Sequence, residues 1–489
     1  MDRRHLLAAG VLAATGSVVA STHGASADAG TPDPLPDHLR HRATGETAVA
    51  DPGVTPYTVG LTIPGQLRPT RVYADHDYYE HTMESAEVRI LPGVKTTALT
   101  FGGSFIGPTI RAKAGRTVRI KYTNRLTEPA NVHLHGGHVA ADNDGHPMDT
   151  IPPGASRVYE YPNRQDPAML WYHDHTHHRE AEHVYRGMHG FYLLESDAEK
   201  QLNLPSGKYD VPMMIRDAAF DENGQLVFDD TVDPLQTRLT TMVNGKVQPY
   251  FAVAARRYRF RLLNTSNHRT FHLSFGDLPV VQVGSDGGLL PRPVPVTELS
   301  ISPAERIDVV VDFGGRAIGS RFLLQTAELG PVLRFDVDRK AKDTSIVPAV
   351  LRTMPAPPVP IRERDITLGL SPDQQWFWID GKPYDPYRID ATVRRGTTEI
   401  WNVHNADTDF GGIEHVFHMH LVQFRVLDRD GAPPLPGESG FKDTVHIPGG
   451  TSVRLLAKFT DFTGVYAYHC HMMEHASTFQ MMAQMEVVT

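Results

Sequence analysis

The 489-residue chain has a single cysteine, Cys470, and few features that would mark a nucleic-acid or membrane protein. One thiol cannot form a disulfide within the chain, so this is no disulfide-stabilised scaffold. Lysine and arginine total 48 against 57 acidic residues, and the formal net charge of −9 excludes a basic surface for nucleic acid or anionic lipid. No apolar run is long enough to span a membrane. These absences favour a globular protein, and the role of its single thiol is the first question.

The first residues resemble an export signal. Arg3 and Arg4 precede an apolar, alanine-rich run, and Ala25–Ala27 is a small-residue cleavage pattern. The paired arginines resemble a twin-arginine signal, and an ordinary secretory signal is the alternative. We therefore predict a signal peptide over residues 1–27 that is read by the export machinery, a flexible leader over 28–54, and an exported protein, either periplasmic or extracellular.

Three stretches of the chain share one pattern, an alternating strand that leads to a turn containing asparagine. They are Thr109–Asn124, Tyr258–Asn264 and Thr392–Asn405. Such alternation is typical of strands with one buried face. Helical periodicity is scarce, while the 41 glycines and 37 prolines indicate many turns. The sequence therefore predicts an all-β protein with three consecutive β-sandwich domains.

The predicted domains cover residues 55–200, 201–340 and 361–489. Residues 341–360 contain five prolines and are predicted to link the second domain to the third. The middle domain has His268 and His272 after its repeated strand, but no His-x-His pair. We therefore predict that only the first and third domains carry metal ligands.

Paired histidines follow the repeated strand in the first and third domains. The pairs are His133/His135, His173/His175, His418/His420 and His469/His471. Residues two apart in a strand share a face, so each pair can direct two imidazoles into one cavity. Cys470 lies between His469 and His471 and would face the opposite way. One short strand could therefore serve two metal centres.

The ligand types favour copper. His415 lies three residues before His418 and combines naturally with Cys470 and His475, which makes eleven ligands in all. A thiolate with imidazoles and a weak thioether is typical of a blue-copper site. Structural zinc takes four ligands and closes its shell, and eleven ligands with one thiolate do not divide into such sites. Chance scattering among 26 histidines is a poor explanation, because one of the four pairs encloses the only cysteine.

Together these motifs resemble those of the multicopper oxidases, laccase-type enzymes built from three cupredoxin domains. The resemblance covers about residues 55–489. Gly284–Gly288 and Ser302–Arg306 are similar to the second domain of the three-domain bacterial laccases, the group of spore-coat laccase, bilirubin oxidase and phenoxazinone synthase. It implies an all-β fold of three consecutive cupredoxin-like Greek-key β-sandwich domains. It also implies four copper ions, one of type 1, one of type 2 and two of type 3.

The same resemblance implies a role for each ligand. The type 1 ligands would be His415, Cys470 and His475; the type 2 ligands His133 and His418; and the type 3 ligands His135, His173 and His471 for one ion and His175, His420 and His469 for the other. Cys470 with its two neighbours would connect the type 1 ion to the three-copper cluster. Asp144 occupies the position of an acidic residue that supplies protons to the cluster; the alternative is a carboxylate in a turn.

The chain departs from the family pattern at two positions. The axial type 1 ligand usually comes five residues after the last histidine, which here is Gln480. If the loop carries one extra residue, the axial ligand is Met481, and we predict Met481 because it is in register with the final strand. Many bacterial relatives have an acidic residue directly after the last type 1 histidine, where this chain has Ala476. Glu474, on the other side of His475, cannot be assumed to replace it.

The predicted function is a laccase-like oxidase. It would take single electrons from phenolic or aminophenolic aromatic molecules at the type 1 copper and reduce dioxygen to water at the three-copper cluster. The alternative is a cuprous or ferrous metallo-oxidase in metal tolerance, but the chain lacks methionine-rich insertions. A scaffold that has lost its metals is excluded by the presence of all eleven ligands. Surplus histidines near the first-domain ligands, including His183 and His189, are expected mostly at the surface or in loops.

Overall fold

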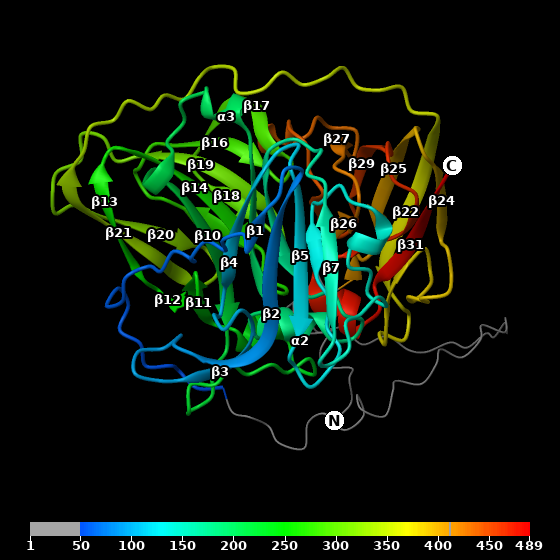
Figure 1. The fold of residues 1–489 in the computed structure, drawn as a ribbon, viewed down its shortest axis with the longest axis horizontal. Helices are drawn as coiled ribbons and strands as arrows, with labels where there is room; N and C mark the ends of the chain where they lie inside the picture. Colours follow the sequence, from blue (N-terminus) through cyan, green and yellow to red (C-terminus); the bar gives the residue numbers. More distant parts are fainter. Residues whose placement is uncertain (1–48, 410–411) are drawn as a thin grey trace, which may run out of the picture.

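The computed structural model describes residues 49–409 and 412–489, and strands dominate it (Figure 1). The strands form six sheets, which pair into three consecutive sandwiches. This confirms the predicted all-β class. The predicted signal peptide, residues 1–27, and the leader up to residue 48 lie outside the described residues and stay predictions, as do the domain limits.

The first sandwich is blue to cyan in Figure 1. Its strands are β1 (Arg71–Val72), β2 (His76–Val88), β3 (Thr96–Phe101), β4 (Gly107–Lys113), β5 (Thr117–Asn124), β6 (His133–His135), β7 (Ser156–Tyr161), β8 (Ala168–His173) and β9 (His189–Glu195). One sheet has the order β1-β2-β5-β7 with β3 beside β2, and the other β4-β9-β8-β6. In β5, Val118, Ile120 and Tyr122 are buried and the residues between them are not, which is the predicted alternation.

The second sandwich, green in Figure 1, has a sheet of seven strands and one of five. Its strands are β10 (Asp210–Ala218), β11 (Thr240–Val243), β12 (Lys246–Val247), β13 (Tyr250–Ala255), β14 (Arg257–Asn264), β15 (Phe271–Ser274), β16 (Val280–Ser285), β17 (Gly288–Val296), β18 (Leu299–Ile301), β19 (Arg306–Asp312), β20 (Arg321–Thr326) and β21 (Gly330–Lys340). The sheets have the orders β12-β11-β10-β14-β19-β16-β17 and β13-β21-β20-β15-β18.

The third sandwich, yellow to red, has two five-stranded sheets. Its strands are β22 (Arg362–Leu370), β23 (Phe377–Ile379), β24 (Ala391–Arg394), β25 (Thr398–Asn405), β26 (His415–Met419), β27 (Arg425–Arg429), β28 (Thr444–Ile447), β29 (Ser452–Lys458), β30 (Gly464–Cys470) and β31 (Met482–Val488). The sheets have the orders β23-β22-β25-β29-β27 and β24-β31-β30-β26-β28.

The helical segments in the described part of the chain are all short, which agrees with the scarcity of helical periodicity. They are η2 (Ala141–Asn143), α2 (Glu180–Tyr185), α3 (Asp197–Lys200), η3 (Gly207–Tyr209), α4 (Pro234–Thr237), η5 (Pro436–Glu438) and η6 (Glu474–Thr478). Among residues 49–409 and 412–489, no helix has the length and apolar character needed to cross a bilayer.

The repeated strand seen in the sequence has the same place in all three sandwiches. β5, β14 and β25 each lie parallel to the first long strand of their own sandwich, namely β2, β10 and β22. Each ends in a buried asparagine, Asn124, Asn264 or Asn405. Its side-chain oxygen accepts a hydrogen bond from the backbone N–H two residues on, and its amide donates to the carbonyl of an isoleucine in a neighbouring segment. The asparagine therefore closes the turn and ties it to a neighbouring segment, which is a strand of the opposite sheet in the second and third sandwiches.

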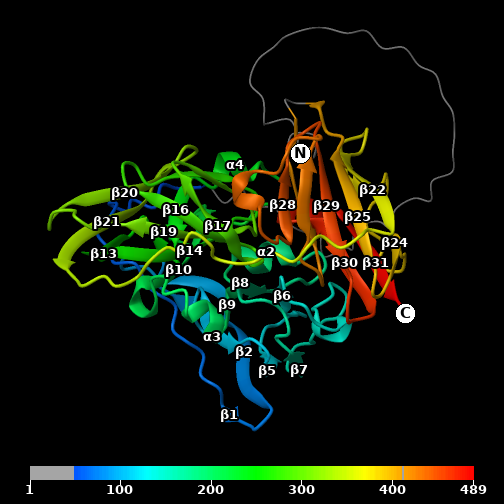
Figure 2. The same cartoon turned by 90° about the horizontal axis from the view of Figure 1, so that it is seen from above.

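Residues between β21 and β22 form no strand and cross the molecule from the second sandwich to the third, the yellow segment at the top of Figure 1. Backbone hydrogen bonds hold this segment, from Ile346 to Asn203 and from Leu351 to Pro291. The first and third sandwiches meet at one end, where β6 and β30 lie close together (Figure 2). That junction contains the paired histidines.

Candidate metal centre

The strand register brings the histidine pairs together two by two. β6 pairs with β8 so that His133 lies opposite His173, and β26 pairs with β30 so that His418 lies opposite His469. Only the His133/His135 pair lies wholly within a strand. In the other three pairs the strand ends before the second histidine. His420 and His471 directly follow the last residue of their strands, and His175 lies two residues beyond the end of β8. The two-residue spacing nevertheless keeps both rings of each pair on one side.

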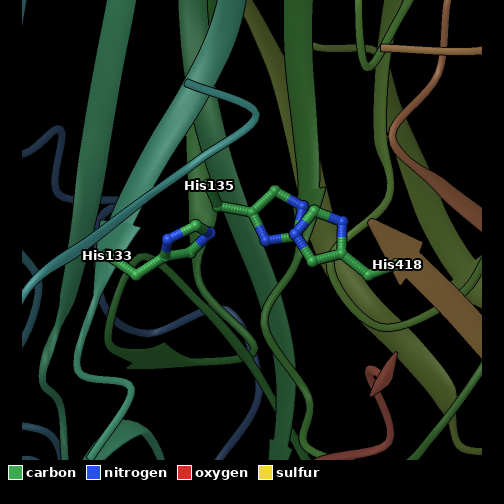
Figure 3. A group of neighbouring side chains, drawn as sticks. All are labelled: His133, His135 and His418. Carbon is green, nitrogen blue, oxygen red and sulfur yellow. The ribbon is translucent and has the colours of Figure 1, made fainter. Parts of the chain in front are cut away.

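Eight histidines from the two sandwiches form three groups whose ligand atoms lie within 4.8 Å of one another. The groups are His133, His135 and His418; His135, His173 and His471; and His175, His420 and His469. Every member is buried, with at most 1% of its surface exposed. Figure 3 shows the first group, in which the ring of His418 stacks on that of His135 with centroids 3.8 Å apart. Each group takes residues from both the first and the third sandwich.

In the rings of His133 and His418, a hydrogen bond occupies one nitrogen and leaves the other nitrogen free. His133 donates from Nδ1 to the carbonyl oxygen of Asp144 at 2.5 Å, and His418 donates from Nδ1 to that of Asp443 at 2.7 Å. The Nε2 atoms of both rings are buried without a partner. A buried nitrogen without a partner is costly unless a ligand fills the space. These two lone pairs therefore indicate a bound cation.

The third group gives the strongest sign of a cation. Nε2 of His469 lies 3.1 Å from Nε2 of His175 and 3.3 Å from Nε2 of His420. The other nitrogens of His420 and His469 donate to Asp144 Oδ2 at 2.7 Å and to the Cys470 carbonyl at 3.0 Å. Burial lowers the pKa of His469 to about 4 and those of the other two rings well below 6.5, so all three rings are uncharged at neutral pH. Because Nδ1 carries the proton in His420 and His469, their Nε2 lone pairs face each other and repel, and a metal ion between them removes the repulsion.

The remaining group has the same character. His135 donates from Nε2 to Asp443 Oδ1 at 3.0 Å and keeps Nδ1 free. His173 donates from Nδ1 to the carbonyl of Asp174 at 2.8 Å and keeps Nε2 free. Both ring nitrogens of His471 lack a partner. Hydrogen bonds that fix one ring nitrogen and expose the other are the usual second layer of a metal site.

Cys470 faces a separate group on the other side of β30. Its sulfur lies 3.7 Å from His415 Nδ1 and 3.6 Å from His475 Nδ1, and those two nitrogens are 3.3 Å apart. His415 donates from Nε2 to Asp407 Oδ2 at 2.8 Å, and Phe377 stacks on His475 at 4.0 Å. Burial raises the pKa of the thiol to about 12, so only a bound soft cation would give the thiolate. The donor set of one sulfur and two imidazoles suits copper.

The two candidates for the axial position, Gln480 and Met481, differ in register and in burial. His469 lies opposite Met482 in the β30–β31 register, so Met481 lies on the face of Cys470, and the Cys470 N–H donates to the Met481 carbonyl at 3.1 Å. Met481 is fully buried in the same core cluster as Cys470, whereas Gln480 is partly exposed. The preceding η6 is a π-turn in which Phe479 N–H donates to the Glu474 carbonyl, and such a turn holds one residue more than an α-helical turn. It accommodates the extra residue that the motif spacing suggested.

Other residues near the ligands take different places. The carboxylate of Asp174 points away from the groups and accepts from the backbone of Asn131. Glu474 pairs with Arg238 at 2.7 Å. The expectation that surplus histidines lie at the surface is wrong for His183 and His189, which are fully buried. Burial alone would lower the pKa of His183, but contacts with Asp174 and Glu128 raise it to about 9, so a protonated ring is held between carboxylates there.

Asp144 reaches the histidines as the motif position suggested. It is fully buried, its Oδ2 accepts from His420, and its Oδ1 has no hydrogen-bond partner and lies 3.6 Å from His133 Nδ1. Burial raises the pKa of this carboxyl well above its ordinary value. No motif pointed to Glu180 in α2, whose buried carboxyl lies 3.8 Å from His173 Nδ1 and 3.7 Å from His175 Nδ1.

A buried ion-pair network on the second sandwich was also missed. Arg306 in β19 donates through two nitrogens to Asp443, the carboxylate that accepts from His135. Asp286 accepts from the Arg306 backbone N–H at 2.8 Å and pairs with Lys442 at 3.0 Å. Asp286 and Arg306 lie in the two second-domain stretches noted for their family resemblance. Asp443 is 308 residues from His135 in the sequence, so no local spacing could have predicted that these two residues are in contact.

Three comparisons with known proteins agree with this geometry. Family models described as multicopper oxidase match residues 82–199, 207–345 and 356–489. A laccase of Bacillus stratosphericus is 35% identical, over 88% of this chain and 98% of its own. A bilirubin oxidase of Albifimbria verrucaria is 34% identical, over 90% of this chain and 82% of its own.

Solved structures give the same result. The crystal structure of a laccase from Pediococcus acidilactici has a TM-score of 0.82 and 33% identity, and the match covers 90% of this chain and 97% of that one. With three sandwiches, four histidine groups that suit copper and family models along most of its length, the chain belongs to the multicopper oxidase family, copper-dependent oxidoreductases that use dioxygen.

Proposed function

We propose that the protein is a laccase-like oxidase that takes single electrons from phenolic and aminophenolic aromatic molecules and reduces dioxygen to water. The observation that carries this is the end of β30. Cys470 faces His415 and His475 on one side, while His469 and His471 face the eight-histidine cluster on the other. Laccase relatives near 35% identity support the substrate class.

We assign each ligand as the motifs implied. The type 1 ion would be held by His415, Cys470 and His475 with Met481 as axial ligand; the type 2 ion by His133 and His418; and the type 3 ions by His135, His173 and His471 and by His175, His420 and His469. When bound, the copper ions supply one-electron redox chemistry and the place where dioxygen is reduced. The protein's own part is to fix one nitrogen of most of these rings, exclude water from the cluster and connect the two regions covalently through Cys470.

The stoichiometry follows from the chemistry. Dioxygen takes four electrons and four protons to give two waters, whereas each phenol gives one electron and one proton. Four donor molecules are therefore oxidised for each dioxygen. His475, which is 3% exposed and lies beside Cys470, is the proposed point of electron uptake.

The test is oxygen uptake by the copper-loaded protein, with a set of phenols and with cuprous ion as donors. Fast oxidation of phenols, with about four turned over per dioxygen, supports the proposal. Cuprous oxidation that far outpaces every phenol would favour the metallo-oxidase alternative instead.

Replacing Asp144 with asparagine is expected to slow oxygen reduction by about 10²-fold or more, the size of effect typical of a lost general acid. The amide can still accept from His420 but carries no carboxyl proton. Anaerobic bleaching of the blue band by a phenol should be unaffected, while its return on adding oxygen should be slow. Asp142, an exposed carboxylate in the same turn, gives the control variant Asp142→Asn. Normal reoxidation of Asp144→Asn would show that Asp144 is only a turn residue.

Replacing Met481 with leucine is expected to raise the reduction potential of the type 1 site. Leucine keeps the buried volume but removes the thioether, which stabilises the oxidised copper more than the reduced form. A redox titration of the blue band measures the shift. Gln480→Ala is the matched control; a shift in that variant and none in Met481→Leu would make Gln480 the axial residue.

A further inference from the structure

A loop of the second sandwich borders the Cys470 group, although that sandwich holds none of the described metal-ligand groups. The Met473 N–H donates to the carbonyl of Asn267 at 2.8 Å, which fixes the loop against the ligand segment. The next residue, His268, lies edge-on to His475 with ring centroids 4.9 Å apart. Donor molecules that reach His475 therefore meet residues of the second sandwich as well as the third.

Glu414 lies at the outer side of this junction. It directly precedes His415, so strand alternation turns its side chain away from the face of His415. Its carboxylate accepts from Thr270, in the same loop as His268, at 3.2 Å and from His446 at 2.6 Å. The side chain is still 38% exposed. A fixed carboxylate therefore remains accessible to solvent beside the ligand segment.

The charges around His268 are mainly acidic. Burial lowers the pKa of His268, and the charges acting on it are the carboxylates of Glu474, Glu414 and Asp233 against the guanidinium of Arg238. Arg238 is bound to Glu474 in a 2.7 Å ion pair. Within the described part of the chain, neither Glu414 nor Asp233 forms an ion pair with a lysine or arginine. An approaching donor therefore meets carboxylates that no lysine or arginine of the described residues neutralises, with His446 as the basic group paired with Glu414.

We propose that Glu414 makes the donor site selective for aromatic molecules that carry a positive charge, such as phenols with an ammonium group, over those that carry a carboxylate or sulfonate. The proposal rests on the proposed function, because it concerns which donors reach His475. The reaction is unchanged: each donor loses one electron and its phenolic proton, and dioxygen is the final acceptor. Glu414 acts on binding through Coulomb attraction, which salt screens.

The experiment compares three phenols that differ only in a remote charge. Tyramine is a cation, 4-ethylphenol is neutral, and 3-(4-hydroxyphenyl)propanoate is an anion; two methylenes separate each charge from the ring. Oxygen uptake by the holoenzyme at pH 7 and low ionic strength gives kcat/KM. We expect tyramine to be preferred to the propanoate, and Glu414→Gln to reduce that preference about fivefold or more. Glutamine keeps the shape and the hydrogen bond from Thr270.

Controls separate charge from structure. Glu414→Asp should retain most of the preference, and 0.5 M salt should weaken it in the wild type. The control variant Glu363→Gln removes another carboxylate, 47% exposed, and should change nothing. Glu363 lies at the start of β22, at the opposite end of that strand from its pairing with Phe377 of β23. The blue spectrum and the type 1 potential of Glu414→Gln should match the wild type, which a distorted copper site would not allow.

The outcomes are distinct. Oxidation of all three phenols without a charge preference, or a preference that survives Glu414→Gln, overturns the role of Glu414 and leaves the laccase-like function standing. Failure to oxidise any phenol overturns the proposed function, and the role of Glu414 with it.

Discussion

The variant Cys470→Ser is expected to lose the blue absorption band and the oxidation of donors. It should also bind three copper ions instead of four. A serine hydroxyl is a hard, protonated oxygen and cannot replace the soft thiolate between His415 and His475. Without the type 1 copper, electrons from a phenol have no acceptor at the donor side. Oxygen uptake with phenols should therefore fall to the background rate.

The eight-histidine cluster should persist in this variant, because its ligands lie on the opposite face of β30. Copper analysis should give three ions per chain, and the circular dichroism spectrum should be unchanged. Ala476→Ser is the matched control, since it adds a hydroxyl to a buried position of the same loop and removes no ligand. A Cys470→Ser protein that keeps its blue colour or four coppers would contradict the assignment of the thiolate site.

Arg306→Ala is expected to give the largest loss of stability, about 3–5 kcal/mol, the cost typical of removing one partner from a buried ion pair. Arg306 is fully buried and donates to Asp443 through two nitrogens and to the carbonyl of Met169 at 3.0 Å. It therefore joins all three sandwiches. Its removal takes away positive charge beside the carboxylates of Asp443 and Asp286, which are buried and cannot be stabilised by water instead.

The loss should extend to copper. Asp443 accepts from His135 with its side chain and from His418 with its backbone carbonyl, so its displacement frees two rings of the cluster. Denaturant unfolding and copper analysis measure the two effects. Arg306→Lys should be intermediate, because lysine keeps the charge but not the two-point geometry.

Arg316→Ala is the matched control for Arg306→Ala. Arg316 forms a 2.9 Å pair with Asp277, whose side chain is 71% exposed, and such surface pairs contribute about 0–1 kcal/mol. An Arg306→Ala protein as stable as Arg316→Ala, with full copper, would show that the buried network does not support the site.

Local sequence patterns were sufficient to predict most of the fold and the set of proposed ligands. The alternation in β5 follows from the requirement that one face of a sandwich strand be buried. The asparagines that end β5, β14 and β25 form the same turn three times because each makes a hydrogen bond only two residues away. The His-x-His spacing likewise needs no knowledge of the fold, since residues two apart share a side of an extended chain.

Spacing left the axial ligand open between Gln480 and Met481. The pairing of β30 with β31 and the π-turn that precedes it favour Met481, because they set which residue shares the face and the core of Cys470. The same limit applied to the surplus histidines. His183 looked like a surface residue, but carboxylates from other segments surround it and make a buried, protonated ring tolerable.

By itself, the sequence determined the all-β class, the threefold repeat and the eleven histidine and cysteine residues proposed as ligands, because these depend on residue type and on separations of a few positions. The family resemblance implied which histidines of the first sandwich meet those of the third, and the structure groups them in the same way. Only the tertiary structure decided that Asp443, Arg306 and Glu180 support them. It also placed His268 beside His475, and Glu414 against Thr270 in the same loop as His268. These contacts join residues tens to hundreds of positions apart, and their energies depend on burial and distance, which exist only once the sandwiches have packed together.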